Sequence, residues 1–195
     1  MKKIIIMFAM LFSITATAND IYVEQSGDGS TVDILQDGTG NTIGDSIAPA
    51  YIGGGANTVN IQQIGSSNSL DAVVNGAATN TTVTTNGSNN VQSITCGTAQ
   101  SGSCSGSVIT QTVTGDTNTI TQALGSGANH TSNITVTGDD NTVTHTSTAT
   151  GTTSANITVS GSTNTIGVTQ AGMTTQSVTV DSTGNSNAIT INQHN

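Results

Sequence analysis

A glycine followed three residues later by an asparagine recurs along most of the chain and constrains its fold more than any other feature. The glycines are Gly27, Gly38, Gly65, Gly87, Gly115, Gly138, Gly161 and Gly184, and the third residue after each is Ser30, Asn41, Asn68, Asn90, Asn118, Asn141, Asn164 and Asn187. The last three intervals between the glycines are 23 residues each. A fixed period of this length is typical of repeat proteins, in which each unit forms one layer of a stack.

Apolar residues alternate with polar ones on both sides of each such turn. They lie four residues before the glycine, at Val23, Ile34, Ile61, Val83, Ile134, Ile157 and Val180, and five after it, at Val32, Ile43, Leu70, Ile120, Val143, Ile166 and Ile189. Alternation with a period of two around a Gly/Asn turn predicts strand, turn, strand. Gln111 interrupts the first column and the pattern shifts around Asn90 and Val91, so we expect the fourth repeat to be irregular.

A half-period is also visible, because Gly54, Gly65 and Gly76 are 11 residues apart, as are Gly27 and Gly38. Each repeat is therefore expected to contain two short strands and two turns. The pattern predicts an all-β fold, a β-solenoid of about seven stacked strand-turn-strand repeats of about 23 residues. Because one layer cannot bury its own apolar face, the stack should be cooperative.

Two segments interrupt the period, one near residues 44–55 and one near 96–104, and we expect both to project as loops. Residues 1–18 have the parts of a secretory signal peptide: Lys2 and Lys3, an apolar run, and a small-residue cleavage site. The mature repeat domain would then be residues 19–195. No later apolar run approaches the ~20 residues that span a bilayer, so we expect a secreted chain without membrane insertion.

Charge and composition exclude several classes of function. Lys2 and Lys3 are the only cationic residues, so the mature chain would carry a formal charge of −11 from its eleven acidic residues. Such a chain cannot neutralise phosphates, and we expect no nucleic-acid partner. The absence of Trp and the scarcity of other aromatic residues would also fit a disordered chain. The strict period, the β-branched residues and the single proline, Pro49, favour a folded one.

Cysteines and histidines give no sign of an active centre. Cys96 and Cys104 are the only cysteines, and in a secreted chain they are expected to form a disulfide. His130, His145 and His194 fall in different repeats without a nucleophile motif, which predicts surface histidines and a protein that is not an enzyme and needs no cofactor.

Acidic residues cluster beside the turns, at Asp28, Asp37, Asp116, Asp139, Asp140 and Asp181. The nonapeptide pattern GGxGxD of calcium-binding rolls is absent, so solvated turn acids are favoured over a metal site, with calcium as the alternative. Glutamines precede three glycines by two residues, at Gln25, Gln36 and Gln63, and recur at Gln170 and Gln193. Stacked amides of this kind would form a hydrogen-bonded ladder between layers.

The repeat resembles that of the curlin family, the subunits of bacterial curli fibres. Its unit has the pattern Ser-x5-Gln-x-Gly-x2-Asn-x-apolar-x3-Gln, in which x is any residue. Matching residues are Ser30, Gln36, Gly38, Asn41 and Ile43, then Gly161, Asn164, Ile166 and Gln170, then Gly184, Asn187, Ile189 and Gln193. The resemblance spans nearly the whole mature chain and marks it as a divergent member.

The resemblance implies a subunit that leaves the cell through an outer-membrane channel with accessory factors and folds on a growing extracellular fibre of identical copies. Such an amyloid fibre serves adhesion and the biofilm matrix. The sequence offers a physical counterpart, since neither end of the predicted stack carries the lysine, arginine or proline that blunts an edge strand. Two alternatives stay open: an ice-binding solenoid with Thr-x-Thr columns, and an adhesin that acts through its two insertions.

Overall fold

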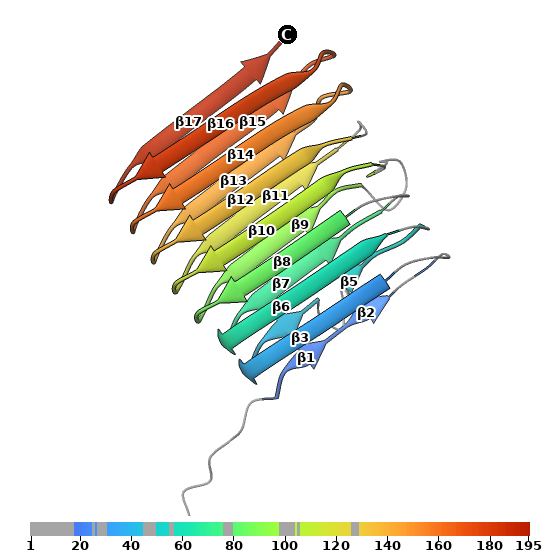
Figure 1. Cartoon of the computed structure of the whole chain (residues 1–195), viewed down its shortest axis with the longest axis vertical. Helices are drawn as coiled ribbons and strands as arrows, with labels where there is room; N and C mark the ends of the chain where they lie inside the picture. Colours follow the sequence, from blue (N-terminus) through green and yellow to red (C-terminus); the bar gives the residue numbers. More distant parts are fainter. Residues whose placement is uncertain are drawn as a thin grey trace, which may run out of the picture.

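The chain forms two parallel sheets that face each other in a flat, elongated stack (Figure 1). The computed structural model describes residues 18–24, 26, 31–44, 50–54, 57–75, 80–97, 104, 106–125 and 129–195. No helix that could cross a membrane occurs among these residues. The predicted signal peptide lies almost entirely outside them, as do Gln25, Gly27 and Asp28.

The first sheet has ten strands in the described part of the chain, and we call it the ten-stranded sheet. Its strands are β1 (Asp20–Ile21), β2 (Val23–Glu24), β4 (Thr42–Ile43), β5 (Ala50–Tyr51), β7 (Ser69–Val73), β9 (Val91–Thr95), β11 (Thr119–Leu124), β13 (Thr142–Ser147), β15 (Thr165–Ala171) and β17 (Ala188–His194). The short pairs β1–β2 and β4–β5 each make up one row of this sheet.

The second sheet has seven strands within the described residues, and we call it the seven-stranded sheet. Its strands are β3 (Thr31–Thr39), β6 (Thr58–Ser66), β8 (Asn80–Asn86), β10 (Val108–Thr114), β12 (Thr131–Thr137), β14 (Thr153–Ser160) and β16 (Gln176–Thr183). The chain alternates between the sheets, so each strand pairs with the strand one full turn later. The predicted all-β solenoid is confirmed, with its N-terminal and C-terminal rows at opposite ends of the stack.

The inner face of each sheet is built by the alternation seen in the sequence. In the seven-stranded sheet, Ile134, Ile157 and Val180 lie in register, one per row. Opposite them, Ile120, Val143, Ile166 and Ile189 form a column of the ten-stranded sheet. Side chains on the strands alternate between buried and exposed, as period-two patterning requires.

The frame of the first repeat differs from the prediction by half a repeat. Val32 pairs with Val59 in the seven-stranded sheet, although the glycine pattern placed it with Ile43 and Leu70. Val23 pairs with Ala50 in the ten-stranded sheet and not with Ile34 or its column. The cause is the 11-residue half-period, which gives the two turns of a repeat similar sequences and lets the wrong glycine, Gly27, set the frame.

The fourth repeat is regular, contrary to the prediction. Asn90 stays in the column of turn asparagines, and Gln92 pairs with Leu70 and Ile120 as an inward residue. Gln92 is buried and accepts a hydrogen bond from Thr85 Oγ1. Gln92 stands where the pattern expects an apolar residue. The sequence pattern therefore shifts at this point, although the register of the backbone does not.

The two predicted insertions are only partly described. Residues 45–49 and 55–56 lie outside the described residues, but β5 lies inside the first predicted insertion and pairs with β2 and β7. Strand pairing therefore resumes at Ala50, earlier than the sequence suggested. In the second insertion, residues 98–103 lie outside the described part of the chain.

Candidate functional site

The turn that carries the repeated glycine has the same backbone shape in successive rows. Gly138 has a φ of 116° and Asp140, two residues later, a φ of 56°. A Cβ on Gly138 would lie 2.2 Å from the carbonyl oxygen of Gly161 in the next row. The glycine is therefore required twice, by its left-handed φ and by the close approach of the stacked turn.

Buried asparagines of these turns form a continuous hydrogen-bonded ladder. Each Asn Oδ1 accepts the backbone N–H of the asparagine in the next row, over 2.9–3.1 Å. Each Nδ2 of the inner rows donates to the glycine carbonyl of the following row, over 2.8–3.0 Å. The ladder runs through Asn19, Asn41, Asn68, Asn90, Asn118, Asn141, Asn164 and Asn187, and the stacked glycines are Gly38, Gly65, Gly87, Gly115, Gly138, Gly161 and Gly184.

The ladder has two different ends. Asn19, which the sequence pattern did not single out, begins it: its Oδ1 accepts the N–H of Asn41 at 3.0 Å and its Nδ2 donates to Gly38 O at 3.3 Å. At the other end no described row follows Asn187, and its Nδ2 donates to Thr183 O in its own turn at 3.3 Å. Gly184 likewise differs from the inner glycines, because no stacked glycine lies against it. The nearest atom to a Cβ built on Gly184 is Asn187 Nδ2, at 3.6 Å.

A second, exposed column of polar groups runs beside the ladder. Ser88 N–H donates to Asp116 Oδ1 at 2.6 Å, and Asp116 N–H donates to Asp139 Oδ1 at 2.8 Å. The turn acids therefore act here as hydrogen-bond acceptors between rows. Among the described residues no group of three His, Cys, Asp or Glu side chains is placed to hold a metal ion.

The described glutamines of the predicted ladder form two separate pairs and not one ladder. Gln36 Nε2 donates to Gln63 Oε1 at 2.7 Å in the first rows of the seven-stranded sheet. Gln170 Nε2 donates to Gln193 Oε1 at 3.0 Å in the last rows of the ten-stranded sheet. Gln25 is outside the described residues. Amide stacking thus reaches the outermost described row of each sheet at opposite ends of the molecule.

Cys96 and Cys104 are joined by a disulfide, as expected, and their Cα atoms are 5.3 Å apart. Both cysteines are buried. Cys96 N–H donates to Val73 O and Cys104 N–H to Asn75 O, so each cysteine is hydrogen-bonded to the preceding row. The bridge therefore closes the longest connection of the stack at the edge of the core and is not exposed on a loop.

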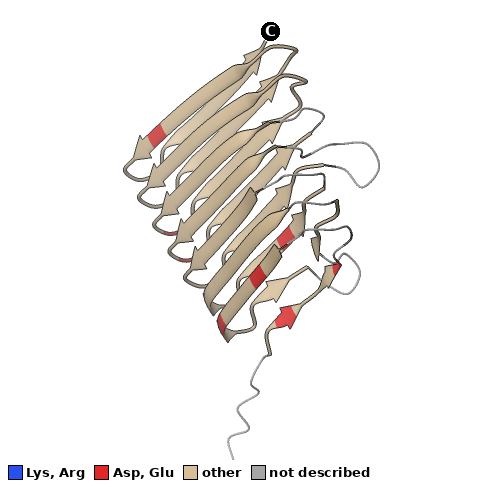
Figure 2. Cartoon of the chain, turned by 45° about the vertical axis from the view of Figure 1, so that its right-hand side comes forward, with Lys and Arg blue, Asp and Glu red and all other residues tan. Residues whose placement is uncertain are grey.

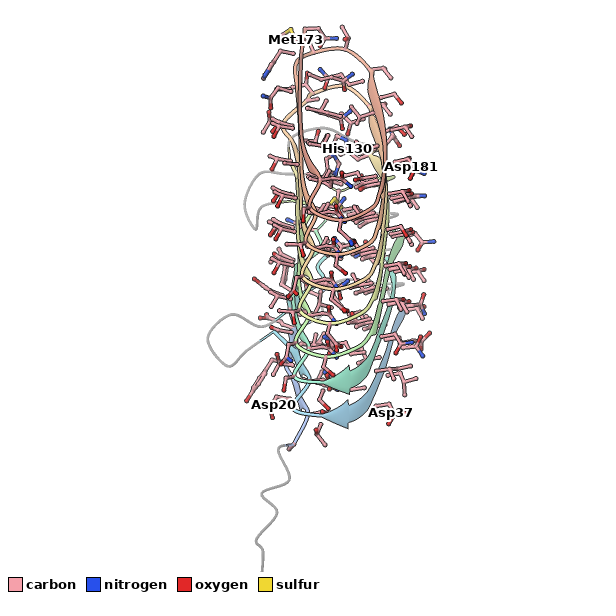
Figure 3. The ribbon with its side chains drawn as sticks, turned by 90° about the vertical axis from the view of Figure 1, so that its left-hand side faces the viewer. Asp20, Asp37, His130, Met173 and Asp181 are labelled. Atoms are coloured by element: carbon pink, nitrogen blue, oxygen red, sulfur yellow. A yellow bond between two sulfur atoms is a disulfide. The ribbon has the colours of Figure 1, made fainter. Side chains whose placement is uncertain are left out.

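Two of the three histidines are not on the surface, so the prediction for them was wrong. His130 and His145 are buried between the sheets, and Figure 3 shows His130 there, while His194 is exposed. Inward orientation follows from the alternation, since His145 lies two residues after Val143 and His130 two before Ser132. The sequence carries this signal in the strand position of each histidine, whereas the residue type alone favours the surface.

His145 belongs to a small polar network inside the stack. Its Nε2 donates to Gln170 Oε1 at 3.1 Å, so the Nδ1 of the neutral ring accepts from Ser132 Oγ at 3.3 Å. Burial lowers the pKa of His145, the hydrogen bond to Gln170 opposes this effect, and the nearby His130 adds to the lowering. The ring is therefore held neutral as a structural group.

The edge strands at the two ends of the stack complete the candidate site. Within the described residues β17 pairs only with β15 and β16 only with β14, while β3 pairs only with β6. The β17 side chains Ile189 and Ile191, which are inner residues of their sheet, are only partly covered. Such edges present free backbone groups that can pair with another strand.

Negative charge is concentrated near the first rows of the stack. Figure 2 shows most of the acidic positions there, and no lysine or arginine occurs in the described residues. The first strands carry Asp20, Glu24, Asp33 and Asp37. Toward the other end, β16 carries Asp181, and β17 carries no acid and one histidine, His194. The two ends therefore differ in charge as well as in shape.

Comparison of the chain with family models, with curated proteins and with solved structures finds no match. The class of the molecule is therefore defined by its own geometry. It is a two-sheet parallel β-solenoid with a buried asparagine ladder and with strand edges that stay unpaired at both ends of its described rows.

Proposed function

We propose that this chain is the structural subunit of an extracellular fibre of the curli type, which grows when identical copies join through the edges of their end rows. The single observation that carries the proposal is the Asn ladder, whose last member, Asn187, bonds to the preceding row as the inner asparagines do but has no following row among the described residues. Every inner row is bonded in the same way to the row before and the row after it.

Backbone pairing supports the proposal. In each row the N–H of the residue after the asparagine donates to the asparagine carbonyl of the next row, as Thr142 N–H does to Asn164 O at 2.8 Å. Ala188 is the corresponding residue of β17, and no further row among the described residues accepts its N–H. A second copy supplies that acceptor, and strand addition to an open edge is a general mode of protein association.

Secretion, the curli-type export channel and its accessory factors belong to the same proposal. They rest on the resemblance of the repeat and on the signal-like residues 1–18. The Cys96–Cys104 disulfide is consistent with an oxidising compartment.

The ice-binding alternative rests on threonines that stack on the outer face of the seven-stranded sheet. Thr84, Thr112, Thr135 and Thr158 are in register in four successive rows. The neighbouring column changes from threonine to Asn133 and Asn156, so paired threonines do not extend over these rows. Thermal hysteresis of the monomer would support this alternative. The adhesin alternative rests on the two insertions, most of whose residues the structure does not describe.

The proposal is tested by incubating the purified mature chain, residues 19–195, and examining it by electron microscopy and fibre diffraction. We expect unbranched fibres with a meridional spacing of about 4.7 Å, the distance between strands. A chain that stays folded and monomeric for days would overturn the proposal.

A matched pair of variants at Thr190 sharpens this test. Tyr22, at the equivalent position of the first row, donates its N–H to Ile43 O in the following row, so Thr190 N–H points to the open edge. Thr190→Pro removes that donor and no bond within the chain, and it should fold but not form fibres. Thr190→Val keeps the donor and should assemble like the wild type.

A further inference from the structure

The two sheets contain unequal numbers of rows. Within the described residues the path through the ten-stranded sheet has eight rows, from β1 to β17, and the seven-stranded sheet has seven, from β3 to β16. Both the first and the last described row therefore belong to the same sheet. This inequality restricts how two copies can join.

Simple end-to-end addition would leave a gap. If β17 of one copy paired with β1–β2 of the next, two rows of the ten-stranded sheet would meet with no row of the other sheet between them. The edges of β16 and of the next copy's β3 would then face each other across the width of one strand. Their backbone groups would stay unpaired, and the inner residues Ile189 and Ile191 would stay partly uncovered.

Both sheets become continuous if β17 takes the place of β1–β2 on the next copy. The strand β17 then pairs with β4–β5 of that copy, and β16 pairs directly with its β3. No row is missing in either sheet. The exchange uses positions that are equivalent by the register of the rows, with Ala188 replacing Asp20 and Ile189 replacing Ile21.

The turn at residues 184–187 fits the same exchange. Asn19 donates its Nδ2 to Gly38 O over 3.3 Å, whereas Asn164 donates to Gly184 O over 2.8 Å. In the place of Asn19, Asn187 would donate its Nδ2 to Gly38 O of the next copy, as the inner asparagines donate to the glycine carbonyl of the following row. Its Oδ1 would accept the N–H of Asn41, which Asn19 Oδ1 accepts within one copy.

The strands to be displaced are among the shortest of the stack and are exposed. β1 and β2 are two residues long, and all four of their residues are exposed, including Ile21 at 49 %. β17 pairs over seven residues with β15 and so forms a continuous strand. The exchange also removes the carboxylates of Asp20 and Glu24 from a row next to the acidic strand β3.

From these observations we infer an interaction surface between copies. In the fibre, β17 and residues 184–187 of one copy occupy the place that Asn19 and β1–β2 hold on the next copy, and they bind there to β4–β5 and to the turn at residues 38–41. The inference rests on the proposed function and specifies its contact. In the free monomer, β1–β2 covers the edge that receives the next copy.

A reversible lock on β1 tests the exchange. Asp20 and Thr42 are register partners on neighbouring parallel strands, a separation that suits a disulfide. The double variant Asp20→Cys/Thr42→Cys is compared with Asp20→Ser/Thr42→Ser, which changes the same positions without a crosslink. We expect the oxidised cysteine variant to elongate seeds at least about tenfold more slowly than the serine variant, and reduction to restore its rate.

A single substitution in the C-terminal turn gives an independent test. In the monomer a Cβ on Gly184 meets no atom closer than 3.6 Å, but in the exchanged joint it would meet Gly38 O as closely as the inner glycines meet their neighbours, near 2 Å. Because Gly184 also has a φ of 109°, Gly184→Ala should lose some stability, but it should still fold and should fail to elongate. Ser186→Ala lies in the same turn, also at positive φ, and should elongate normally.

The outcomes separate the inference from the proposed function. If the wild type forms no fibres, both fall. If the wild type forms fibres and the oxidised lock elongates as fast as the serine variant with its crosslink intact, the exchange is wrong and the fibre subunit stands. Normal elongation of Gly184→Ala would likewise overturn the exchange, because simple end-to-end addition leaves Gly184 without a neighbour.

Discussion

An asparagine suits the inside corner of the repeated turn because its short amide carries an acceptor and a donor in one plane. Asn141 shows the full set: its Oδ1 accepts from the backbone and the side chain of Asn164, and its Nδ2 donates to Asn118 Oδ1 and Gly161 O. No backbone group can take this place, since the chain reverses there. A residue that looks like a simple turn former is therefore a buried connection between three rows.

Asn141→Ala should destabilise the fold by roughly 2–4 kcal/mol, because it leaves buried partners in Asn118 and Asn164 unsatisfied. The free energy of unfolding in denaturant measures this loss. Asn185→Ala is the control, since that exposed side chain accepts only from Ser162 N–H at 2.7 Å, and it should cost less than about 1 kcal/mol. Equal losses for both variants would show that the ladder is not the stabilising feature.

His145 should make the stability of the fold depend on pH. Burial lowers its pKa below the ordinary 6.5, so the unfolded chain takes up a proton more readily than the folded one as the pH falls below that value. The stabilisation is complete above pH 6.5 and declines as the medium becomes acidic. Denaturant midpoints between pH 7.5 and 5.5 should fall more steeply for the wild type than for His145→Gln, and parallel slopes would contradict the assignment.

At the scale of the strand, the sequence predicted the elements well where glycine, asparagine and an apolar residue recur together. It placed β12 to β17 in their correct order and register because three successive intervals of 23 residues leave no alternative. It failed at β1 to β3, where two similar turns 11 residues apart compete for the same frame. The residue type predicted His130 and His145 on the surface, although the alternation along the strands places both side chains inside.

The longest connection of the stack, between β9 and β10, is the element that the disulfide stabilises. Cys96→Val/Cys104→Ala should lower the free energy of unfolding by roughly 2–3 kcal/mol, the loop-closure effect expected for a short loop. Valine suits position 96 because Val74 precedes it in the same column. The comparison is with the oxidised wild type, and reduced wild type should match the variant. A denaturant midpoint that does not move would show that packing alone holds this connection.

At the scale of the whole molecule, electrostatics opposes association. Eleven acidic residues and no cation after Lys3 give every copy the same sign of charge. The repulsion between copies is screened by salt, since the Debye length falls from about 30 Å at 0.01 M to about 8 Å at 0.15 M.

Fibre elongation should therefore accelerate by roughly tenfold between these two salt concentrations. Seeded growth followed by light scattering gives the rate, and sucrose at equal osmolality is the control for effects other than charge. Asp37→Asn, which removes one carboxylate from the first rows, should show a smaller response. A rate that does not change with salt would show that charge repulsion does not limit growth.

Parallel pairing throughout both sheets has one more consequence. Every strand of a sheet points the same way and every turn of the chain advances in the same sense, so no two-fold symmetry relates the two ends of the stack. Any filament made by repeating this unit is therefore polar. Its two tips are chemically distinct, they should add subunits at unequal rates, and a molecule that caps one tip would leave the other free to grow.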